Sequence, residues 1–337
     1  MNVAALPYAY GGPALRGVIR ATPEDFFVDE DLGFALDGAG EHVFVRVEKR
    51  GANTDWVARE LAKFAGLRPD AVSYSGIKDR HAVTRQTFSL HLPGKADPRW
   101  EECRSDEFRI IDVARHGRKL KRGAHKRNRF KIIIRDVQGD LARANGIFSS
   151  IAAHGVPNYF GEQRFGRDSA KVDRALAMFA GKRVQRHERS LLLSAARSHI
   201  FNSILAERVA NGRWNAPLDG DVWMLDGTHS IFGPEPISAE LSDRCARGDI
   251  SPTGALWGAG TLRGEGAVAE IEQRAADENA ALASGLVAAG LNQERRSLVL
   301  RMAECVLEWP EPNVLSLSFN LSSGSYATVV IREICEV

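Results

Sequence analysis

Strand and helix patterns alternate through the first 150 residues, and this alternation restricts the possible folds more than any other feature. Residues 40–50 (GEHVFVRVEKR) alternate polar and apolar side chains, which is typical of a half-buried strand. Residues 53–66 then offer helix-capping side chains, apolar residues at helical spacing and a closing glycine. Strand patterns recur in QTFSLHLPG and FRIIDVARH, and a helical pattern runs from Asp140 to Ala153. The pattern predicts a domain built on a sheet.

The character of the sequence changes at Gly155. A stretch rich in glycine and aromatic residues is followed by a helical segment, ARSHIFNSILAERVANG, and then by a glycine- and proline-rich region over 212–266. A long helical segment is predicted near 267–300, and the end of the sequence alternates as a strand, a turn and a final element. This layout predicts a sheet-based domain that is interrupted by a second, more helical one.

Length and composition indicate an ordinary globular protein. The 337 residues suffice for about two domains. No stretch approaches the roughly 20 consecutive apolar residues of a membrane-spanning helix, and the first residues lack a secretory pattern. The four cysteines are scattered without metal-binding or disulfide spacing. We therefore expect a cytoplasmic protein with reduced thiols and no membrane association.

The positive charge is concentrated in one internal segment. Residues 115–131 contain nine lysines and arginines and no acid, whereas the other residues carry 36 basic and 43 acidic side chains. Such a run is often only a solvated face. However, it contains two glycines and continues into a strand pattern, FKIIIRDV. A basic loop that is anchored to a sheet is suited to holding phosphates.

Signatures of common cofactors are missing. The glycines of residues 258–264 (GAGTLRG) depart by one residue from the dinucleotide-binding pattern and follow no clear strand. The sequence also lacks GxxxxGK[ST], HExxH and GxSxG motifs. ATP-, metal- and serine-based chemistries thereby lose support.

Residues 75–86 (SGIKDRHAVTRQ) are the strongest candidate for a reactive site. Seven polar side chains fall within nine residues between two structured segments. An ordinary surface turn would also be polar. Yet a carboxylate beside several cations keeps its ionised form, as a nucleophile or general base requires, and the same cations would attract phosphate. Asp79 is therefore a candidate nucleophile or general base.

Six motifs resemble the TruD family of tRNA pseudouridine synthases. GIKDRHAVTRQ resembles its catalytic motif, and PEDFFVDEDLGF (23–34) resembles its N-terminal signature. The others, in the family's order, are HKRNRF (125–130), VPNYFGEQRFG (156–166), RSLLLSAARSHIFN (189–202) and GSYATVVIRE (324–333). Together they span nearly the whole chain, with a weaker match at about 212–290.

The resemblance implies an α+β fold. The family's pseudouridine synthase catalytic domain has a mixed, largely antiparallel sheet and is interrupted by an inserted TRUD α/β domain. Here the catalytic domain would comprise 1–154 with 301–337, and the inserted domain 155–300. RNA would bind along the basic segment, with Lys119, Lys121, Arg122, Lys126, Arg127 and, in the inserted domain, Arg164 as contacts.

The resemblance also implies an enzyme that isomerises uridine at position 13 of tRNA, with Asp79 as nucleophile and without a cofactor or a metal. Whether Asp79 attacks C1′, attacks C6 or removes a sugar proton is left open, as are the identities of the tRNAs. The uridine must leave its stack and lie between flat and polar groups. By resemblance, Phe26 and Tyr326 contact substrate, Asn128 binds it by a hydrogen bond, and Phe130 stacks on the base. Without the motif, core packing would be the simpler interpretation of Phe26 and Phe130.

Lys78, His81 and Arg20 are secondary candidates. For each, an ion-paired or phosphate-facing cation is as good an interpretation as a catalytic role. The family can have lysine at the position of Arg20 and phenylalanine at that of Tyr326. Two other functions are weighed: a silent tRNA-binding protein, which would not need the Asp79 motif, and a methyltransferase, for which no donor-binding loop is convincing. A monomer without an obligate protein partner is expected.

Overall fold

The computed structural model describes residues 5–166 and 169–337, which form two compact units. We call the first the sheet unit; it comprises Leu15–Asp140, Met302–Gly324 and Val337. We call the second the helical unit; it comprises Met1–Ala14, Leu141–Arg301 and Ser325–Glu336. The catalytic and inserted domains expected with boundaries near 154 and 300 remain a prediction.

One large sheet dominates the sheet unit. Its strands follow the order β14-β15-β7-β2-β5-β3-β6, with β1 beside β7 and β4 beside β5. Neighbouring strands pair antiparallel, except that β2 and β5 pair parallel. The predicted α+β fold with a mixed, largely antiparallel sheet is confirmed. The strands are β1 (Leu15–Ile19), β2 (Phe26–Asp31), β3 (His42–Arg50), β4 (Val72–Tyr74), β5 (Val83–His91), β6 (Phe108–His116), β7 (Arg127–Gly139), β14 (Ala303–Glu311) and β15 (Val314–Ser322).

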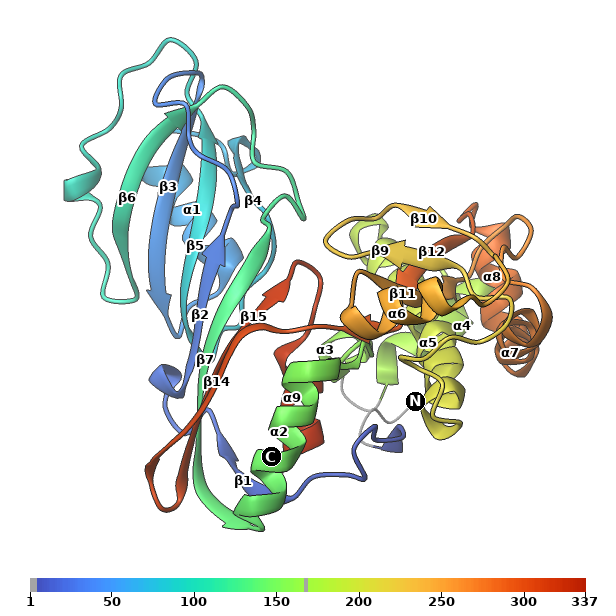
Figure 1. Cartoon of the computed structure of the whole chain (residues 1–337). Coiled ribbons are helices and arrows are strands. Elements are labelled where there is room, and N and C mark those ends of the chain that lie inside the picture. Colours follow the sequence, from blue (N-terminus) through green and yellow to red (C-terminus); the bar gives the residue numbers. More distant parts are fainter. Residues whose placement is uncertain (1–4, 167–168) are drawn as a thin grey trace. The chain divides into compact units, whose positions relative to one another are not determined.

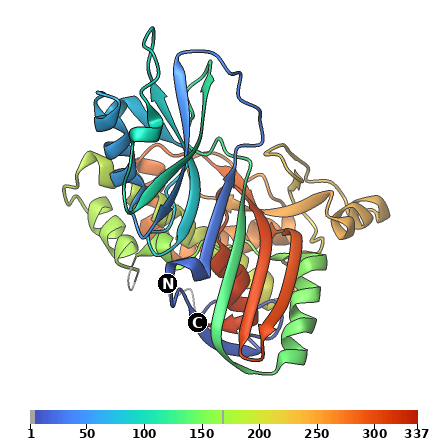
Figure 2. The same ribbon diagram turned by 90° about the vertical axis from the view of Figure 1, so that its left-hand side faces the viewer.

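Helix α1 (Thr54–Phe64) covers one face of this sheet (Figure 1). The alternation in β3 directs Val43, Val45 and Val47 toward the helix, and each is 0% exposed. Leu61 of α1 packs into the same core cluster. At the other end of the sheet, β7 lies beside β15, with β14 beyond it (Figure 2, green and red). The strands predicted over 40–50 and in FRIIDVARH are confirmed as β3 and β6.

The helical unit is organised around the 25-residue helix α5. Helices α4, α7 and α8 pack on α5, as does strand β11 of a sheet with the order β10-β9-β11-β12. Ile200, Ile204 and Leu205 of α5 are fully or almost fully buried, as their helical spacing predicts. The helices are α2 (Leu141–His154), α3 (Glu162–Phe165), α4 (Ala170–Phe179), α5 (Arg186–Ala210), α6 (Ala239–Arg247), α7 (Gly266–Glu278), α8 (Ala280–Ala288) and α9 (Ala327–Ile334). The strands are β8 (Val156–Pro157), β9 (Trp223–Leu225), β10 (Ile231–Phe232), β11 (Ile250–Leu256), β12 (Glu294–Ser297), β13 (Val299–Leu300) and β16 (Cys335–Glu336).

The long helix predicted near 267–300 is wrong in its second half. The helical residues are divided between α7 and α8 and end at Ala288. Gly290 then adopts a left-handed backbone with φ of 82°, which stops a helix readily. The residues beyond it form β12, which pairs with β11 some 40 residues earlier in the chain. In residues 294–297, pairing with a distant strand thus outweighs the local helical propensity. In the described residues, no helix is both long and apolar enough to cross a membrane.

Candidate active site

Three neighbouring strands bring polar and aromatic residues to one face of the sheet. Because opposite residues of an antiparallel pair share a face, Asn128 lies beside Glu30 of β2, and Phe130 lies beside Val28. Strand β15 extends the second row with Phe319, which is opposite Phe130. Val28 and Glu30 are buried, whereas Phe130 is half-buried.

Asp79 lies in the loop between β4 and β5 of the same unit. Its Oδ2 accepts a hydrogen bond of 2.7 Å from Nη2 of Arg20, and its Oδ1 accepts one of 3.0 Å from the backbone N–H of His81. The side chains of Asp79 and Arg20 are 18% and 23% exposed. Arg20 follows β1 directly and has a left-handed backbone, with φ of 57°, which is uncommon for a residue other than glycine. The carboxylate is thus oriented from two sides and remains accessible to a ligand.

Lys49 holds the Asp79 loop from the buried side. Its Nζ donates to the backbone oxygen of Asp79 at 2.7 Å and to that of Ala52 at 2.8 Å. The residue is 1% exposed, and burial lowers the pKa of Lys49 to about 8. Sequence reasoning missed this residue, although a signal was present: the alternation of β3 places Lys49 on the buried face that holds Val47.

Lys78 is part of a buried ion pair. Its Nζ lies 2.6 Å from Oε2 of Glu30, and the two side chains are 7% and 0% exposed. Oε2 of Glu30 also accepts a hydrogen bond from the hydroxyl of Ser75 at 2.6 Å, and its Oε1 accepts one from the Thr87 N–H at 3.1 Å. This ion pair holds Lys78, the residue before Asp79, against β2.

Asn128, which lies opposite Glu30 in the sheet, contacts His125. Nδ2 of Asn128 lies 3.1 Å from Nε2 of His125, and both residues are buried. Burial and the nearby charge of Lys78 lower the pKa of His125, which favours the neutral imidazole. The Oδ1 atom of Asn128 has no hydrogen-bond partner within the described residues. Because an unpaired buried acceptor is costly, this oxygen is suited to a donor supplied by a ligand.

Aromatic rings adjoin the carboxylate. The guanidinium of Arg20 lies 4.3 Å from the centroid of the Phe26 ring. Phe26 packs edge-to-face on Phe130 at 6.3 Å, and Phe130 packs on Phe319 at 5.6 Å. Phe26 is only 4% exposed in this structure. Phe130 is the more accessible ring of the two.

The basic segment is attached to the same loop. It forms the connection from β6 to β7, and the Gly123 N–H donates to the backbone oxygen of Ser75 at 2.6 Å. Lys119, Lys121, Arg122 and Lys126 are exposed. Arg127 differs, because its guanidinium pairs with Asp31 at 2.8 Å and with Glu304 at 3.4 Å. The basic segment itself contains no acid, but Arg127, at its junction with β7, is neutralised by Asp31 and Glu304.

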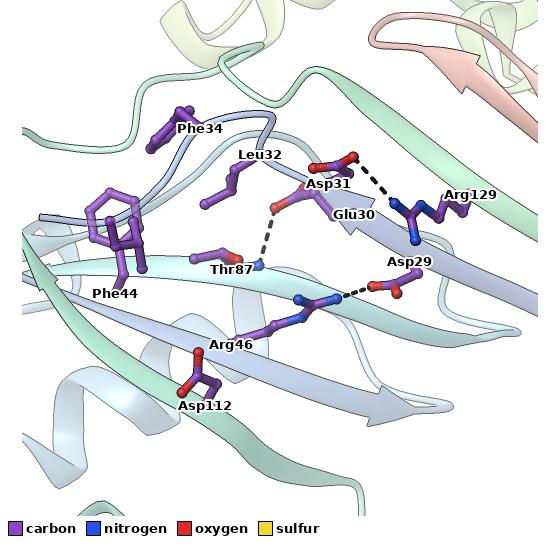
Figure 3. Close-up of a pocket in the computed structure, with 11 residues that line it drawn as sticks. Asp29, Glu30, Asp31, Leu32, Phe34, Phe44, Arg46, Thr87, Asp112 and Arg129 are labelled. Carbon is purple, nitrogen blue, oxygen red and sulfur yellow. Dashed lines mark hydrogen bonds and ion pairs between the residues drawn. The ribbon is translucent and has the colours of Figure 1, made fainter. Parts of the chain in front are cut away.

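A cavity of about 240 Å³ lies on the opposite face of the sheet (Figure 3). Asp29 and Asp31 line it, where they pair with Arg46 at 2.6 Å and Arg129 at 3.7 Å. Arg129 alternates along β7 with Asn128 and therefore points away from the Asp79 face. These four charged side chains pair with one another, and the cavity lies on the face away from Asp79. We therefore assign the cavity no part in the chemistry.

Two predicted residues belong to the helical unit. Tyr326 lies directly before α9 and is half-buried, with its ring centroid 6.3 Å from that of Phe160. The guanidinium of Arg164, in α3, lies 5.9 Å from the Tyr326 ring. The structure thus brings Arg20, Phe26, Lys78, His81, Asn128 and Phe130 together with Asp79 in the sheet unit, and Arg164 together with Tyr326 in the other.

Comparisons with known proteins identify the relatives of this chain. The sequence matches the family model of tRNA pseudouridine synthase D (TruD) over residues 2–176 and 173–334. It is 48% identical to tRNA pseudouridine synthase D of Xanthomonas campestris pv. campestris (strain 8004), over 98% of this chain and 95% of that protein. It is 47% identical to the protein of the same name from Aeromonas salmonicida (strain A449), over 98% and 94%. A crystal structure of a putative tRNA pseudouridine synthase D from Methanosarcina mazei has the same fold, with a TM-score of 0.74, 21% identity and coverage of 98% and 96%.

Proposed function

Because the chain belongs to the TruD family of tRNA pseudouridine synthases, we propose that it acts on uridine 13 of tRNA and that Asp79 is its nucleophile. The chain is an isomerase that converts uridine to pseudouridine in tRNA. This identification replaces the two alternatives of a silent RNA-binding protein and a methyltransferase. We also propose that it works in the cytoplasm as a monomer.

The observation that carries the role of Asp79 is the way its carboxylate is held. A partly exposed carboxylate is oriented by Arg20 and by the His81 N–H, and Lys49 fixes its backbone from the buried side. A nucleophile requires this kind of fixed position, because reactive geometry must be held before the substrate arrives. Phe130 and Asn128 share one face of the sheet, and Oδ1 of Asn128 has no hydrogen-bond partner within the described residues.

The reaction exchanges one bond at the sugar for another. The C1′–N1 bond breaks, the uracil turns within the site, and a C1′–C5 bond forms, while the C5 proton leaves and N1 gains one. All atoms of the uridine are retained. In this proposal Asp79 starts the reaction, Phe130 stacks on the base and Asn128 accepts a hydrogen bond from it. Phe26 and Tyr326 are proposed as aromatic contacts of the substrate, and Lys78 and Arg20 as residues that position the Asp79 loop.

The proposed chemistry predicts a product of unchanged mass in the absence of added cofactors. Purified protein is incubated with a prefolded tRNA transcript in excess chelator, without nucleotide or methyl donor. We expect full conversion to pseudouridine, detected by carbodiimide labelling, and an intact tRNA mass equal to that of the substrate. A product heavier by a methyl group, or an activity restored only by one particular metal, would contradict the proposal. Several different cations are compared, so that RNA misfolding is recognised.

The exposed part of the basic segment is proposed to hold tRNA phosphates. Replacement of Lys119, Lys121 and Arg122 by alanine should weaken tRNA binding at low salt. Each lost phosphate contact removes about 0.7–0.9 from the slope of log affinity against log salt, so the slope should fall by roughly two. Turnover at saturating tRNA should change much less, because these residues position the RNA. Binding across a salt series measures both quantities.

The matched control removes three other exposed cations of the same unit, Arg59, Lys63 and Arg68. Net charge then changes equally, and we expect a clearly smaller change in slope. Equal slopes in the two triple variants would mean that the basic segment acts only through net charge. Loss of saturated turnover with intact binding would instead place the segment among the catalytic groups.

A further inference from the structure

Arg164 and Arg296 lie together around one buried aromatic ring of the helical unit. The Phe160 ring is 7% exposed, and the guanidinium carbon of Arg296 lies 4.2 Å from its centroid. That of Arg164 lies 5.2 Å from the same centroid and 5.9 Å from the centroid of Tyr326. Both arginines are half-buried. Sequence reasoning singled out Arg164 but not Arg296.

The segment around these residues is held firmly. Asn202, which is 0% exposed, accepts a hydrogen bond from the Phe160 N–H at 2.9 Å and donates one to the Phe160 oxygen at 3.0 Å. Asn158 donates to the backbone oxygen of Ser297 at 2.8 Å. The ring and the strand that bears Arg296 are therefore fixed before any ligand binds, which lowers the entropic cost of binding.

The polar partners of both guanidinium groups are neutral. Nη2 of Arg296 donates to Oδ1 of Asn158 at 2.6 Å, and Nη1 of Arg164 donates to the hydroxyl of Ser194 at 2.7 Å. In residues 5–166 and 169–337, neither arginine forms an ion pair, and the Nε atoms of both have no hydrogen-bond partner. Burial first, and then the charge of Arg164, lower the pKa of Arg296 to about 10.

Two more deeply buried arginines of this unit pair with carboxylates. Arg208 pairs with Asp221 at 2.8 Å, with side chains that are 2% and 0% exposed. Arg295, the residue next to Arg296, pairs with Glu272 at 2.8 Å and is 5% exposed. Burial of a cation without an anion is costly, and two such cations side by side add like-charge repulsion. Within the described residues, neither Arg164 nor Arg296 has an anion beside it, so a ligand could supply the compensating charge.

We propose that Arg164 and Arg296 together bind one phosphodiester group of the tRNA substrate. Arginine forms forked hydrogen bonds with phosphate oxygens, and the half-buried position strengthens such a contact relative to a lysine at the surface. The inference rests on tRNA being the substrate, but not on the role of Asp79. It adds Arg296 to the RNA-binding residues and gives Arg164 a defined ligand atom.

The test measures tRNA affinity across a salt series for Arg296→Gln, Arg164→Gln and Arg296→Lys. We expect each glutamine variant to bind roughly tenfold more weakly and to lower the salt slope by at most the roughly 0.7–0.9 that one phosphate contributes. Arg296→Lys should keep most of the slope, because it retains the charge, but should bind more weakly than wild type. Arg274→Gln is the matched control, since Arg274 is an exposed arginine of the same unit that pairs with Glu207, and it should resemble wild type.

Three outcomes would overturn this proposal. The first is a folded Arg296→Gln variant with the affinity and salt slope of wild type. The second is an Arg296→Lys variant that binds as tightly as wild type, because the forked contact would then be unnecessary. The third is that inorganic phosphate raises the melting temperature of wild type more than that of Arg296→Gln, while tRNA affinity is equal in both, which would indicate a site for free phosphate. Failure of the Asp79 mechanism is distinguishable, because it would abolish none of these binding differences.

Discussion

Asp79→Asn should lose pseudouridine formation by roughly three orders of magnitude or more, as removal of a nucleophile typically does. Its affinity for tRNA should stay close to that of wild type. Asparagine has nearly the same size, and its amide oxygen can still accept a hydrogen bond from Arg20 or from the His81 N–H. It lacks the negative oxygen that attacks. The rate is measured under saturating tRNA, and binding is measured with the same preparation.

The matched control is Asp70→Asn, which removes a carboxylate of the same unit whose side chain is 70% exposed and which pairs with Arg68. This variant should form pseudouridine at the wild-type rate. A loss of activity in Asp79→Asn that is accompanied by an equal loss of tRNA affinity would point to binding as the role of Asp79.

Lys78→Met should lower the free energy of unfolding by about 3–5 kcal/mol, because it leaves a buried carboxylate without its cation. Glu30 is the carboxylate in question, at 0% side-chain exposure and 2.6 Å from Lys78 Nζ. Methionine preserves the length and most of the packing of the side chain. Because Lys78 directly precedes Asp79, activity should also fall. Denaturant unfolding gives the free energy, and the midpoint and the slope are both compared with wild type.

The double variant Lys78→Met with Glu30→Leu should recover much of this stability, since no charge is then left buried. Arg68→Met, which breaks the exposed pair with Asp70, should change stability little. A Lys78→Met variant as stable as wild type would show that the pair contributes little and that the Asp79 loop is held by other contacts.

Much of the sheet could be predicted because its strands have one buried face. Val43, Val45 and Val47 alternate with polar residues, and the structure places all three against α1. The same rule gives β6. Local patterns do not report pairing between distant segments, however, so the approach of β12 to β11 was missed and a helix was predicted in its place.

The candidate site was predictable in part, and mainly through the resemblance of its motifs. Asp79 stood out in a polar loop, but nothing local connects it with Arg20, which lies 59 residues earlier and has a left-handed backbone. The alternation of β3 could have predicted that Lys49 is buried. Its place near the end of the strand made an exposed lysine the simpler interpretation. Arg296 gave no local signal, since its role depends on Phe160 and on the absence of a carboxylate partner within the described residues.

Carbodiimide mapping of one tRNA at nucleotide resolution is the most direct test of Asp79 as the nucleophile that acts on uridine 13. The transcript is incubated to completion with an excess of wild-type protein or of Asp79→Asn, and each labelled position is read out. We expect one pseudouridine, at uridine 13, with wild type and none with Asp79→Asn, although both proteins should bind the transcript equally. The same label at uridine 13 after treatment with purified Asp79→Asn would contradict the assignment of Asp79 as the nucleophile.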